Sequence, residues 1–277
     1  MILSKENFNI NPILLTNLVF GFFPISFVLG NFVTNVNLIL FCILGIIQLR
    51  SKILTFKFNL AIKIIFLFFL IVFFSTSLNF LNSLYLEEYK DYDLVKLVKS
   101  LIYFRFFLFL VVVYLLSETE VLDLKYFFLS ATFITLLLSL DIIFQYIFGF
   151  DIIGNKSLPS HNSGFFGDEL IAGSFIKNFS FFSIFFLAFL TKDKKFFMPI
   201  LIIISICIFG TAIIFSGNKM PFILFLLGLF LIFLFKNKLK KVILASLLIL
   251  FTITSIIFSF DEGIKRNYSS YYRNAYN

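Results

Sequence analysis

Several residue types that carry chemistry are scarce in this sequence of 277 residues. The only histidine is His161, which excludes a zinc site built on histidines, and we expect no metal and no cofactor. The two cysteines, Cys42 and Cys207, both lie inside apolar runs, which excludes a disulfide framework and a cysteine metal site. Tryptophan is absent, so any aromatic belt at a membrane surface must be made by the 11 tyrosines.

Charge is also scarce. Charged residues make up 14% of the chain, against about 25% in a typical soluble domain. With 60% hydrophobic residues and a mean hydropathy of +1.03, the chain cannot cover a surface that faces water, so its solvent is expected to be lipid. Lipid requires every backbone polar group to be paired within the protein, which leaves helices or a closed barrel. Continuous runs such as IIFLFFLIVFF lack the alternation of barrel strands and predict helices.

We therefore predict an all-α, polytopic helical bundle embedded in a membrane. Apolar runs near the ~20 residues needed to span a bilayer predict about nine transmembrane helices, at 11–30, 33–49, 60–80, 100–117, 126–148, 168–190, 196–215, 220–235 and 242–259. Residues 1–259 form one transmembrane domain in this interpretation. Residues 260–277 are then the start of an outside loop that is cut short.

The positive charges predict an orientation. The net charge of +8 comes largely from short loops between apolar runs, so we expect no nucleic-acid partner. Three such loops fall on one side, which the positive-inside rule makes cytoplasmic. The N-terminus is then cytoplasmic as well. The residues concerned are Arg50, Lys52 and Lys57, then Lys192, Lys194 and Lys195, and finally Lys236, Lys238, Lys240 and Lys241.

Polar residues inside two predicted helices are candidates for function. Arg105 lies a few residues into the fourth predicted helix, within YFRFF. A charge in lipid usually faces a cavity or a partner, although a position near a helix end also allows snorkelling to the surface. Asp141 in the fifth predicted helix could pair with Arg105 or orient it, and Gln145 shares its face one turn later.

Two polar stretches stand out on the outer side. The first, SHNSGFFGDELIAGSFIK at 160–177, passes Gly164 and Gly167 and is expected to enter a helix with Asp168 and Glu169 in its first turn. Those carboxylates would also suit simple capping of the helix dipole. The second, Ser216-Gly217-Asn218-Lys219, is either a tight turn whose lysine meets headgroups or a cation at the mouth of a cavity.

In combination, these stretches resemble the O-antigen ligase and polymerase superfamily of bacterial envelopes. The resemblance is carried by SGFFGDELIAGSFI after DIIFQYIFG, followed by FSGNKMPFILFLLG, from about Ser100 to Phe230. Members of this superfamily show an R-x-S-G-x-F-G-D-E loop, later an S-G-E-R turn, and an arginine near the start of the fourth helix. Here His161 and Lys219 stand at the two arginine positions of the loop and the turn.

The resemblance implies glycosyl transfer at the outer face of the bacterial inner membrane. The donor would be a glycan on undecaprenyl pyrophosphate, and the acceptor a sugar hydroxyl on lipid A–core or on another lipid-linked glycan. Membrane lipid would surround the site. Fixed cations would stabilise the charge that grows on the departing pyrophosphate. The implied donor contacts are Arg105, Lys219, Lys177 and Arg266, with His161 as the candidate base, while Ser163, Gly164, Gly167, Asp168 and Glu169 would orient the loop or bind sugar hydroxyls.

The sequence departs from the superfamily at points that bear on activity. Lysine keeps the charge of arginine but loses its bidentate fork, so Lys219 is not an equivalent pyrophosphate ligand. The long outside loop that carries a histidine base in the superfamily is expected beyond Asn277, where this chain ends. Two alternatives therefore stay open: a transporter or flippase of lipid-linked glycans, and a non-catalytic, truncated remnant.

Overall fold

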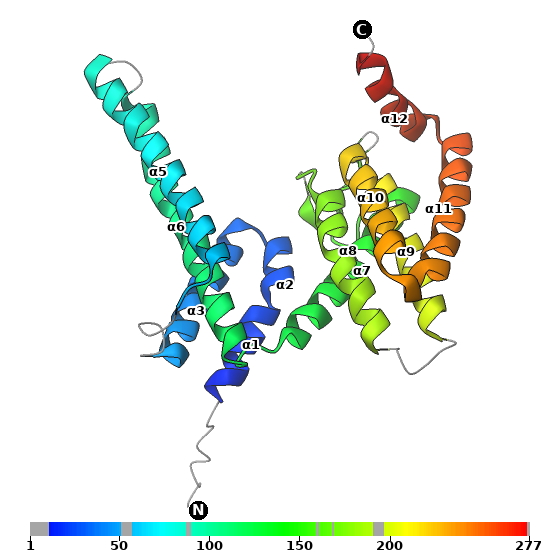
Figure 1. The fold of residues 1–277 in the computed structure, drawn as a ribbon. Coiled ribbons are helices and arrows are strands. Elements are labelled where there is room, and N and C mark those ends of the chain that lie inside the picture. Colours follow the sequence, from blue (N-terminus) through cyan, green and yellow to red (C-terminus); the bar gives the residue numbers. More distant parts are fainter. Residues whose placement is uncertain are drawn as a thin grey trace, which may run out of the picture. The chain divides into compact units, whose positions relative to one another are not determined.

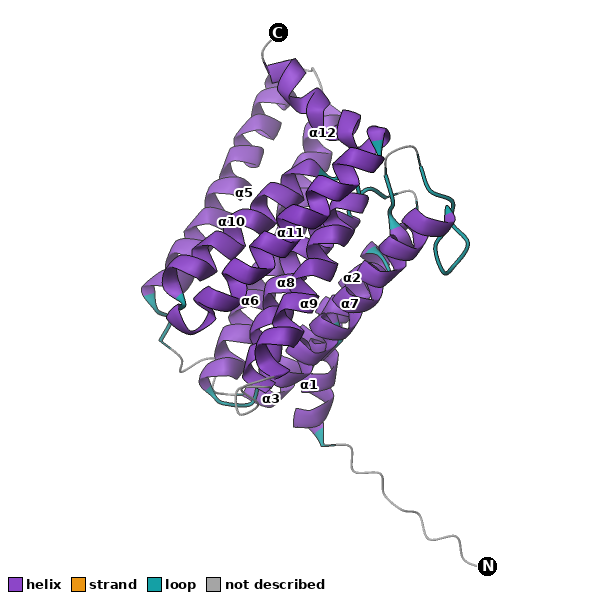
Figure 2. Cartoon of the chain, turned by 90° about the vertical axis from the view of Figure 1, so that its right-hand side faces the viewer, coloured by secondary structure: helices purple, strands orange, loops and turns teal. Residues whose placement is uncertain are grey.

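The computed structural model describes residues 11–50, 57–86, 90–158, 161–167, 169–190 and 197–275. Within these ranges the chain is all-α, and Figure 2 shows helices and loops without a strand. Seven of the described helices are long and apolar enough to cross a membrane, and two apolar helices are shorter. The predicted helical membrane bundle is confirmed at this level, while the number nine stays a prediction. The predicted loop lysines Lys52, Lys192, Lys194 and Lys195, and the candidate Asp168, lie outside the described residues.

The chain folds as two compact units, Met1–Tyr126 and Phe127–Asn277. The first unit contains α1 (Pro12–Gly21), α2 (Phe23–Val28), α3 (Asn31–Leu49), α5 (Leu60–Leu86) and α6 (Lys90–Glu118). The second contains all but the first three residues of α7 (Leu124–Phe148). It also contains the 3-10 turn η1 (Gly164–Phe166), α8 (Ala172–Leu190), α9 (Phe197–Phe215), α10 (Lys219–Phe235), η2 (Asn237–Leu239), α11 (Lys240–Phe260) and α12 (Glu262–Ala275). Neither a linker nor a change in composition marks this division in the sequence.

The first predicted helix, 11–30, is wrong as a single element, because it is divided into α1 and α2. Pro24 sits in the first turn of α2 and has no N–H to donate to the carbonyl of Phe20, so the hydrogen-bond ladder breaks there. At the other end, Asn11 caps α1 by accepting a hydrogen bond from Ile13 N at 3.0 Å. Two short helices result.

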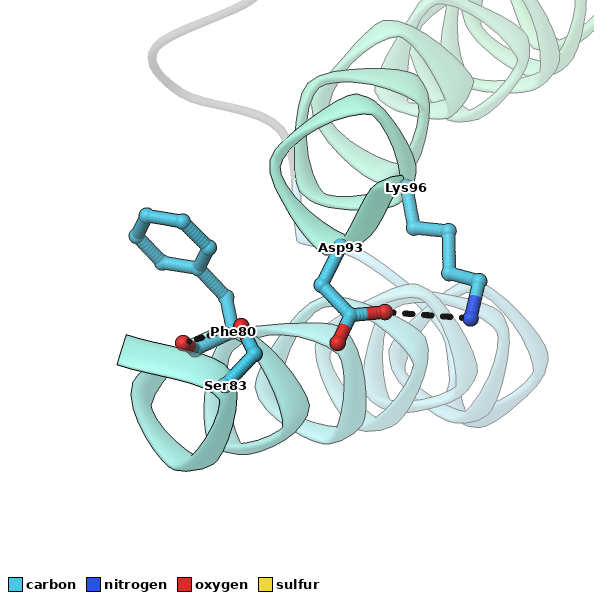
Figure 3. Close-up of polar contacts among 4 residues, drawn as sticks. All are labelled: Phe80, Ser83, Asp93 and Lys96. Atoms are coloured by element: carbon cyan, nitrogen blue, oxygen red, sulfur yellow. Dashed lines mark hydrogen bonds and ion pairs between the residues drawn. The ribbon is translucent and has the colours of Figure 1, made fainter. Parts of the chain in front are cut away.

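Helices α5 and α6 form a hairpin and lie side by side along their lengths (Figure 1). Aromatic pairs such as Phe66 with Phe107, whose ring centroids are 5.1 Å apart, hold the two helices together. Both helices are longer than the predicted 60–80 and 100–117, because polar turns continue the helices beyond the apolar spans. In that polar part Ser83 bonds to Phe80 O and Lys96 pairs with Asp93 at 3.1 Å (Figure 3).

The second unit is built around α9, which packs against α8, α10 and α11. Its core consists of fully buried apolar side chains, among them Ile176, Ile184, Ile206, Phe209 and Phe225. Glycines let neighbouring helices approach closely: a Cβ at Gly210 would lie 2.6 Å from Leu250 Cδ1, and Gly228 faces the ring of Phe181 in the same way.

The residues after 259 include a helix. Asp261 starts α12 by accepting a hydrogen bond from Ile264 N at 2.9 Å, as aspartate commonly does at a helix N-cap. In Figure 1, α12 leaves the end of α11 at an angle. The identity of this segment as the start of an outside loop stays a prediction.

Candidate functional site

The two polar stretches singled out in the sequence meet in the second unit. His161 Nδ1 lies 3.3 Å from Ser216 O, and Asn162 Nδ2 donates to Phe215 O at 2.8 Å. From the other side, Asn218 Nδ2 donates to Leu170 O at 3.0 Å. The loop that follows α7 and the turn between α9 and α10 therefore form one assembly, although some 50 residues of chain separate them.

A glycine makes this close approach possible. Gly173 lies in the first turn of α8, and a Cβ there would collide with Ser216 Oγ and lie 3.1 Å from Asn218 Cβ. Any larger residue would push the turn away from α8. Gly173 therefore lets the turn Ser216-Gly217-Asn218-Lys219, called the lysine turn below, pack directly on α8.

Two buried side chains of α7 hold the loop. Asp141 Oδ1 accepts a hydrogen bond from Ile152 N at 2.9 Å, and Gln145 Oε1 accepts one from Gly164 N at 2.8 Å. Both side chains are fully buried. The sequence offered Asp141 as a partner of Arg105. Its hydrogen bond in the structure runs instead to the backbone of the loop, which it positions together with Gln145.

Gly164 and Gly167 shape the loop. Both have positive φ, 54° and 60°, which favours glycine. Ser163 Oγ donates to Gly167 O across the intervening 3-10 turn. Because this turn continues the loop, α8 begins at Ala172 and not at 168 as predicted. Glu169 is exposed and precedes the helix, so its predicted place in the first helical turn is wrong.

Asp151 is a loop organiser that sequence reasoning missed. Its fully buried carboxylate accepts hydrogen bonds from the N–H groups of Ile153, Gly154 and Asn155 at 3.0, 2.7 and 2.6 Å. The signal was present, since aspartate followed by Gly-Asn is typical of a side-chain-stabilised turn. Asp151 therefore helps to fix the loop before it reaches His161.

A cavity of about 450 Å³ opens beside the lysine turn. Lys219 reaches it from the first turn of α10, where the helix dipole is positive. Lys265, Tyr268 and Ser269 reach it from α12, and their spacing of three and four residues places them on one helix face. The remaining walls are apolar and come from Phe222, Ile223, Leu226 and Phe258.

Tyr268 lines this cavity, but its hydroxyl is not on the cavity surface. Its hydroxyl is buried and has no hydrogen-bond partner within the part of the chain that the structure describes. Burial raises the pKa of Tyr268, so the group stays a neutral donor at ordinary pH. A cavity with two lysines and apolar walls suits an anion attached to an apolar chain. Lys265, Tyr268 and Ser269 were not predicted, because only the fold of α12 brings them to Lys219.

Two other predicted cations of this unit do not line the cavity. Arg266 pairs with Glu262 at 2.9 Å on an exposed face of α12. Lys177 donates to the neighbouring Asn178 at 2.5 Å. Helix α12 is anchored instead by Asn267, whose Nδ2 donates to Gly217 O at 3.2 Å.

Arg105 belongs to the first unit, while the other candidates lie in the second. It lines an apolar cavity of about 660 Å³ between α5 and α6, which Lys63 also reaches. Its guanidinium lies 4.8 Å from the ring centroid of Phe106, and its Nε is buried without a hydrogen-bond partner among the described residues. A cation in such surroundings usually faces a cavity or a polar partner.

Comparisons with known proteins give no independent assignment. No model of a protein family, no curated protein and no solved structure matches the chain. The assignment of a function therefore depends on the residues and contacts of this chain.

Proposed function

We propose that this protein is a membrane glycosyltransferase of the O-antigen ligase and polymerase type. It transfers a glycan from undecaprenyl pyrophosphate to a sugar hydroxyl, either on lipid A–core or on another lipid-linked glycan. The observation that carries the proposal is the cavity in which Lys219 and Lys265 face apolar walls. The loop and the turn that carry the family resemblance meet beside it.

The chemistry of the donor fits such a cavity. When the acceptor hydroxyl attacks the anomeric carbon, the bond to pyrophosphate breaks and negative charge grows on the leaving group. Fixed cations in a partly dry cavity stabilise that charge strongly, because the surroundings screen it less than water does. The apolar walls from Phe222, Leu226 and Phe258 offer a surface for the polyprenyl chain.

Two lysines on different helices offset the loss of an arginine fork. A single ammonium is a point charge and cannot grip a phosphate with two parallel hydrogen bonds. Lys219 from α10 and Lys265 from α12 together supply two such charges. We propose that these two groups bind the pyrophosphate.

The proposed location is the bacterial inner membrane, with the N-terminus in the cytoplasm. The described cations of the predicted cytoplasmic side support this orientation through the positive-inside rule. They are Arg50, Lys57, Lys236, Lys238, Lys240 and Lys241. A protease-sensitive tag at the N-terminus should be protected in spheroplasts and cleaved only after the inner membrane is opened. Cleavage of the tag in intact spheroplasts would contradict the proposed orientation and place the N-terminus outside.

Binding of the lipid tests the cation cavity directly. Purified protein in nanodiscs is titrated with undecaprenyl pyrophosphate and with undecaprenol, which lacks the phosphates. We expect Lys219→Ala and Lys265→Ala each to weaken binding of the pyrophosphate about tenfold, the usual effect of removing one charged hydrogen bond. Lys238→Ala, an exposed cation at the other end of α10, is the matched control. Equal binding of both lipids, or no loss in either cavity variant, would overturn the site.

The reaction itself separates transferase from flippase. Proteoliposomes containing the protein receive a lipid-linked glycan and an acceptor, and the glycan products are analysed. A transferase consumes the donor and forms a longer or newly attached glycan. We expect Lys219→Ala to abolish this glycan transfer while its insertion into the membrane is unchanged. Movement of the glycan across the bilayer without a product identifies a flippase, and neither event identifies a remnant. Both of these results reject the proposed function.

A further inference from the structure

A second, smaller cavity lies in the same unit and differs in chemistry from the lysine cavity. Its volume is about 240 Å³, below the ~300–1,000 Å³ of typical sites for drug-sized ligands. Four separate stretches of chain contribute to it. They supply Tyr146, Gly149, Ser157, Leu158, Asn162, Phe215, Asp261, Gly263 and Ile264.

The central polar group is the carboxylate of Asp261. Its Oδ2 accepts a hydrogen bond from Tyr146 Oη at 2.7 Å, and its Oδ1 accepts one from Ile264 N at 2.9 Å. The backbone N–H of Gly263 also bonds to this carboxylate, so one of its four lone pairs stays open for a ligand. Burial alone would raise the pKa of Asp261, but these hydrogen bonds outweigh it and lower the pKa, so the group is ionised at neutral pH.

The other lining groups add neutral hydrogen-bonding capacity and a flat surface. Ser157 Oγ lies 2.7 Å from Asn162 Oδ1, and Asn162 Nδ2 uses one of its two protons on Phe215 O. The ring of Tyr146 stacks on that of Phe215, with centroids 3.8 Å apart and planes inclined by 11°. The cavity therefore combines a carboxylate, an amide and a hydroxyl with an aromatic wall.

This combination selects the class of ligand. No lysine, arginine or histidine is among the described residues that line the cavity, so a second phosphate would meet only the negative charge of Asp261. A single carboxylate is also too few ligands for a metal, and no group of three metal-ligating side chains occurs in the described ranges. A small ligand with several hydroxyl groups would instead donate to Asp261 and exchange hydrogen bonds with Ser157 and Asn162.

We propose that this cavity binds the hydroxyl groups of one sugar residue, with Asp261 as their main hydrogen-bond acceptor. This inference rests on the proposed glycosyl transfer and assigns the sugar side of the same reaction. Position supports it: Asp261 O accepts from Lys265 N at 3.1 Å, so the carboxylate lies one helical turn from a lysine of the pyrophosphate cavity. Helix α12 thus contributes residues to both cavities.

The absence of tryptophan allows a direct binding test. Leu158 lines the cavity and is 41% exposed, so Leu158→Trp introduces the single indole of the protein at its rim. The protein is held in lipid nanodiscs, because maltoside detergents carry sugar headgroups that would compete. It is titrated separately with D-glucose, D-galactose and N-acetyl-D-glucosamine. We expect a saturable change in indole fluorescence with at least one of them.

Substitutions at Asp261 separate ligand binding from helix capping. Asp261→Asn keeps an oxygen to cap α12 but loses the charge, and we expect it to weaken the sugar response about tenfold with little loss of stability. Glu262→Gln, the exposed neighbour that pairs with Arg266, is the matched control and should bind sugar normally. Tyr146→Phe should weaken the response less, because it removes one hydrogen bond and keeps the stacked ring.

Two results would overturn the inference. One is an unchanged sugar response in Asp261→Asn, which would mean that Asp261 only caps α12. The other is the absence of a saturable response to all three sugars. Calorimetry on the unsubstituted protein checks this result, in case the Leu158→Trp variant does not insert into the membrane. Undecaprenyl pyrophosphate binding is measured on the same samples. If the protein binds undecaprenyl pyrophosphate but no sugar, only this inference is rejected. If it does not bind undecaprenyl pyrophosphate, the proposed function is rejected.

Discussion

The two units differ in where they bury polar side chains. In the first unit the side chains of Asn17, Ser26, Thr34 and Asn37 are buried on α1 to α3, where each donates to a backbone carbonyl. In the second unit many gather where loop and turn meet: Asp141, Gln145, Asp151, Asn162, Ser163 and Ser216. Buried polar groups are costly unless they are fully hydrogen-bonded. This dense cluster lies in the unit to which we assign the proposed function.

The units nevertheless share one device, a buried amide that fixes a loop. In the first unit Asn17 donates to Val121 O at 3.0 Å and accepts from Asp123 N at 2.7 Å. In the second, Gln145 makes the same two kinds of bond, to Asn155 O and from Gly164 N. The loop held by Asn17 only connects helices, whereas the loop held by Gln145 delivers His161 to the lysine turn.

The largest effect should come from filling the glycine contacts. Gly173→Val places a branched side chain against Ser216 and Asn218, and Gly45→Val places one against Val112 and Leu116. Each should lower the stability of its unit by about 3 kcal/mol, the upper end of overpacking costs. Unfolding in denaturant measures both losses. Only Gly173→Val should also abolish binding of undecaprenyl pyrophosphate. An equal loss of lipid binding in Gly45→Val would contradict the functional difference between the units.

Removing the amides should cost somewhat less. Gln145→Ala and Asn17→Ala each leave a backbone N–H and a carbonyl without their partner, and each should destabilise by about 2 kcal/mol. Limited proteolysis should then cut 149–167 in the first variant and 119–123 in the second. If Gln145→Ala leaves the loop as resistant as in the unsubstituted protein, the loop is held by Asp141 and Asp151 alone.

A smaller, pH-dependent effect is expected from Asp261. Because its pKa is lowered in the folded protein, it stabilises the fold above the ordinary aspartate value of about 3.9, and this stabilisation is lost as the pH falls through the folded value. The unfolding midpoint should therefore drop between about pH 5 and about pH 2, and drop less in Asp261→Asn. An identical drop in that variant would assign the pH dependence to other carboxylates.

The smallest effects should come from the ion pairs among the described residues, which lie one in each unit. The pair in the first unit is part-buried, and the pair in the second is exposed. Lys96→Ala removes the pair with Asp93, and Arg266→Ala removes the pair with Glu262. Pairs three or four residues apart on a helix surface contribute about 0.3 kcal/mol. Unfolding measured at low and high salt should show the loss in each variant shrinking as salt rises. A loss above about 1 kcal/mol in either would indicate a contact beyond the pair.

Most helices could be located from the sequence, because hydropathy alone decides which segments partition into the membrane. It failed where other physics decides. Pro24 breaks the first predicted span through a missing N–H, and the polar turns around Asp93 extend α6 past its apolar part. At the site, local motifs pointed to His161 and Lys219. Lys265 and Tyr268 stayed hidden, because a helix far along the chain must fold back before they reach Lys219.

The shared helix α12 has a thermodynamic consequence. It lines the lysine cavity with Lys265 and Tyr268 and the carboxylate cavity with Asp261. If occupancy of one cavity shifts this helix, affinity at the other changes, and linkage requires the change to be equal in both directions. The two substrates of the proposed reaction would then select each other at the binding step. A single 14-residue helix would set that cooperativity before the two substrates react.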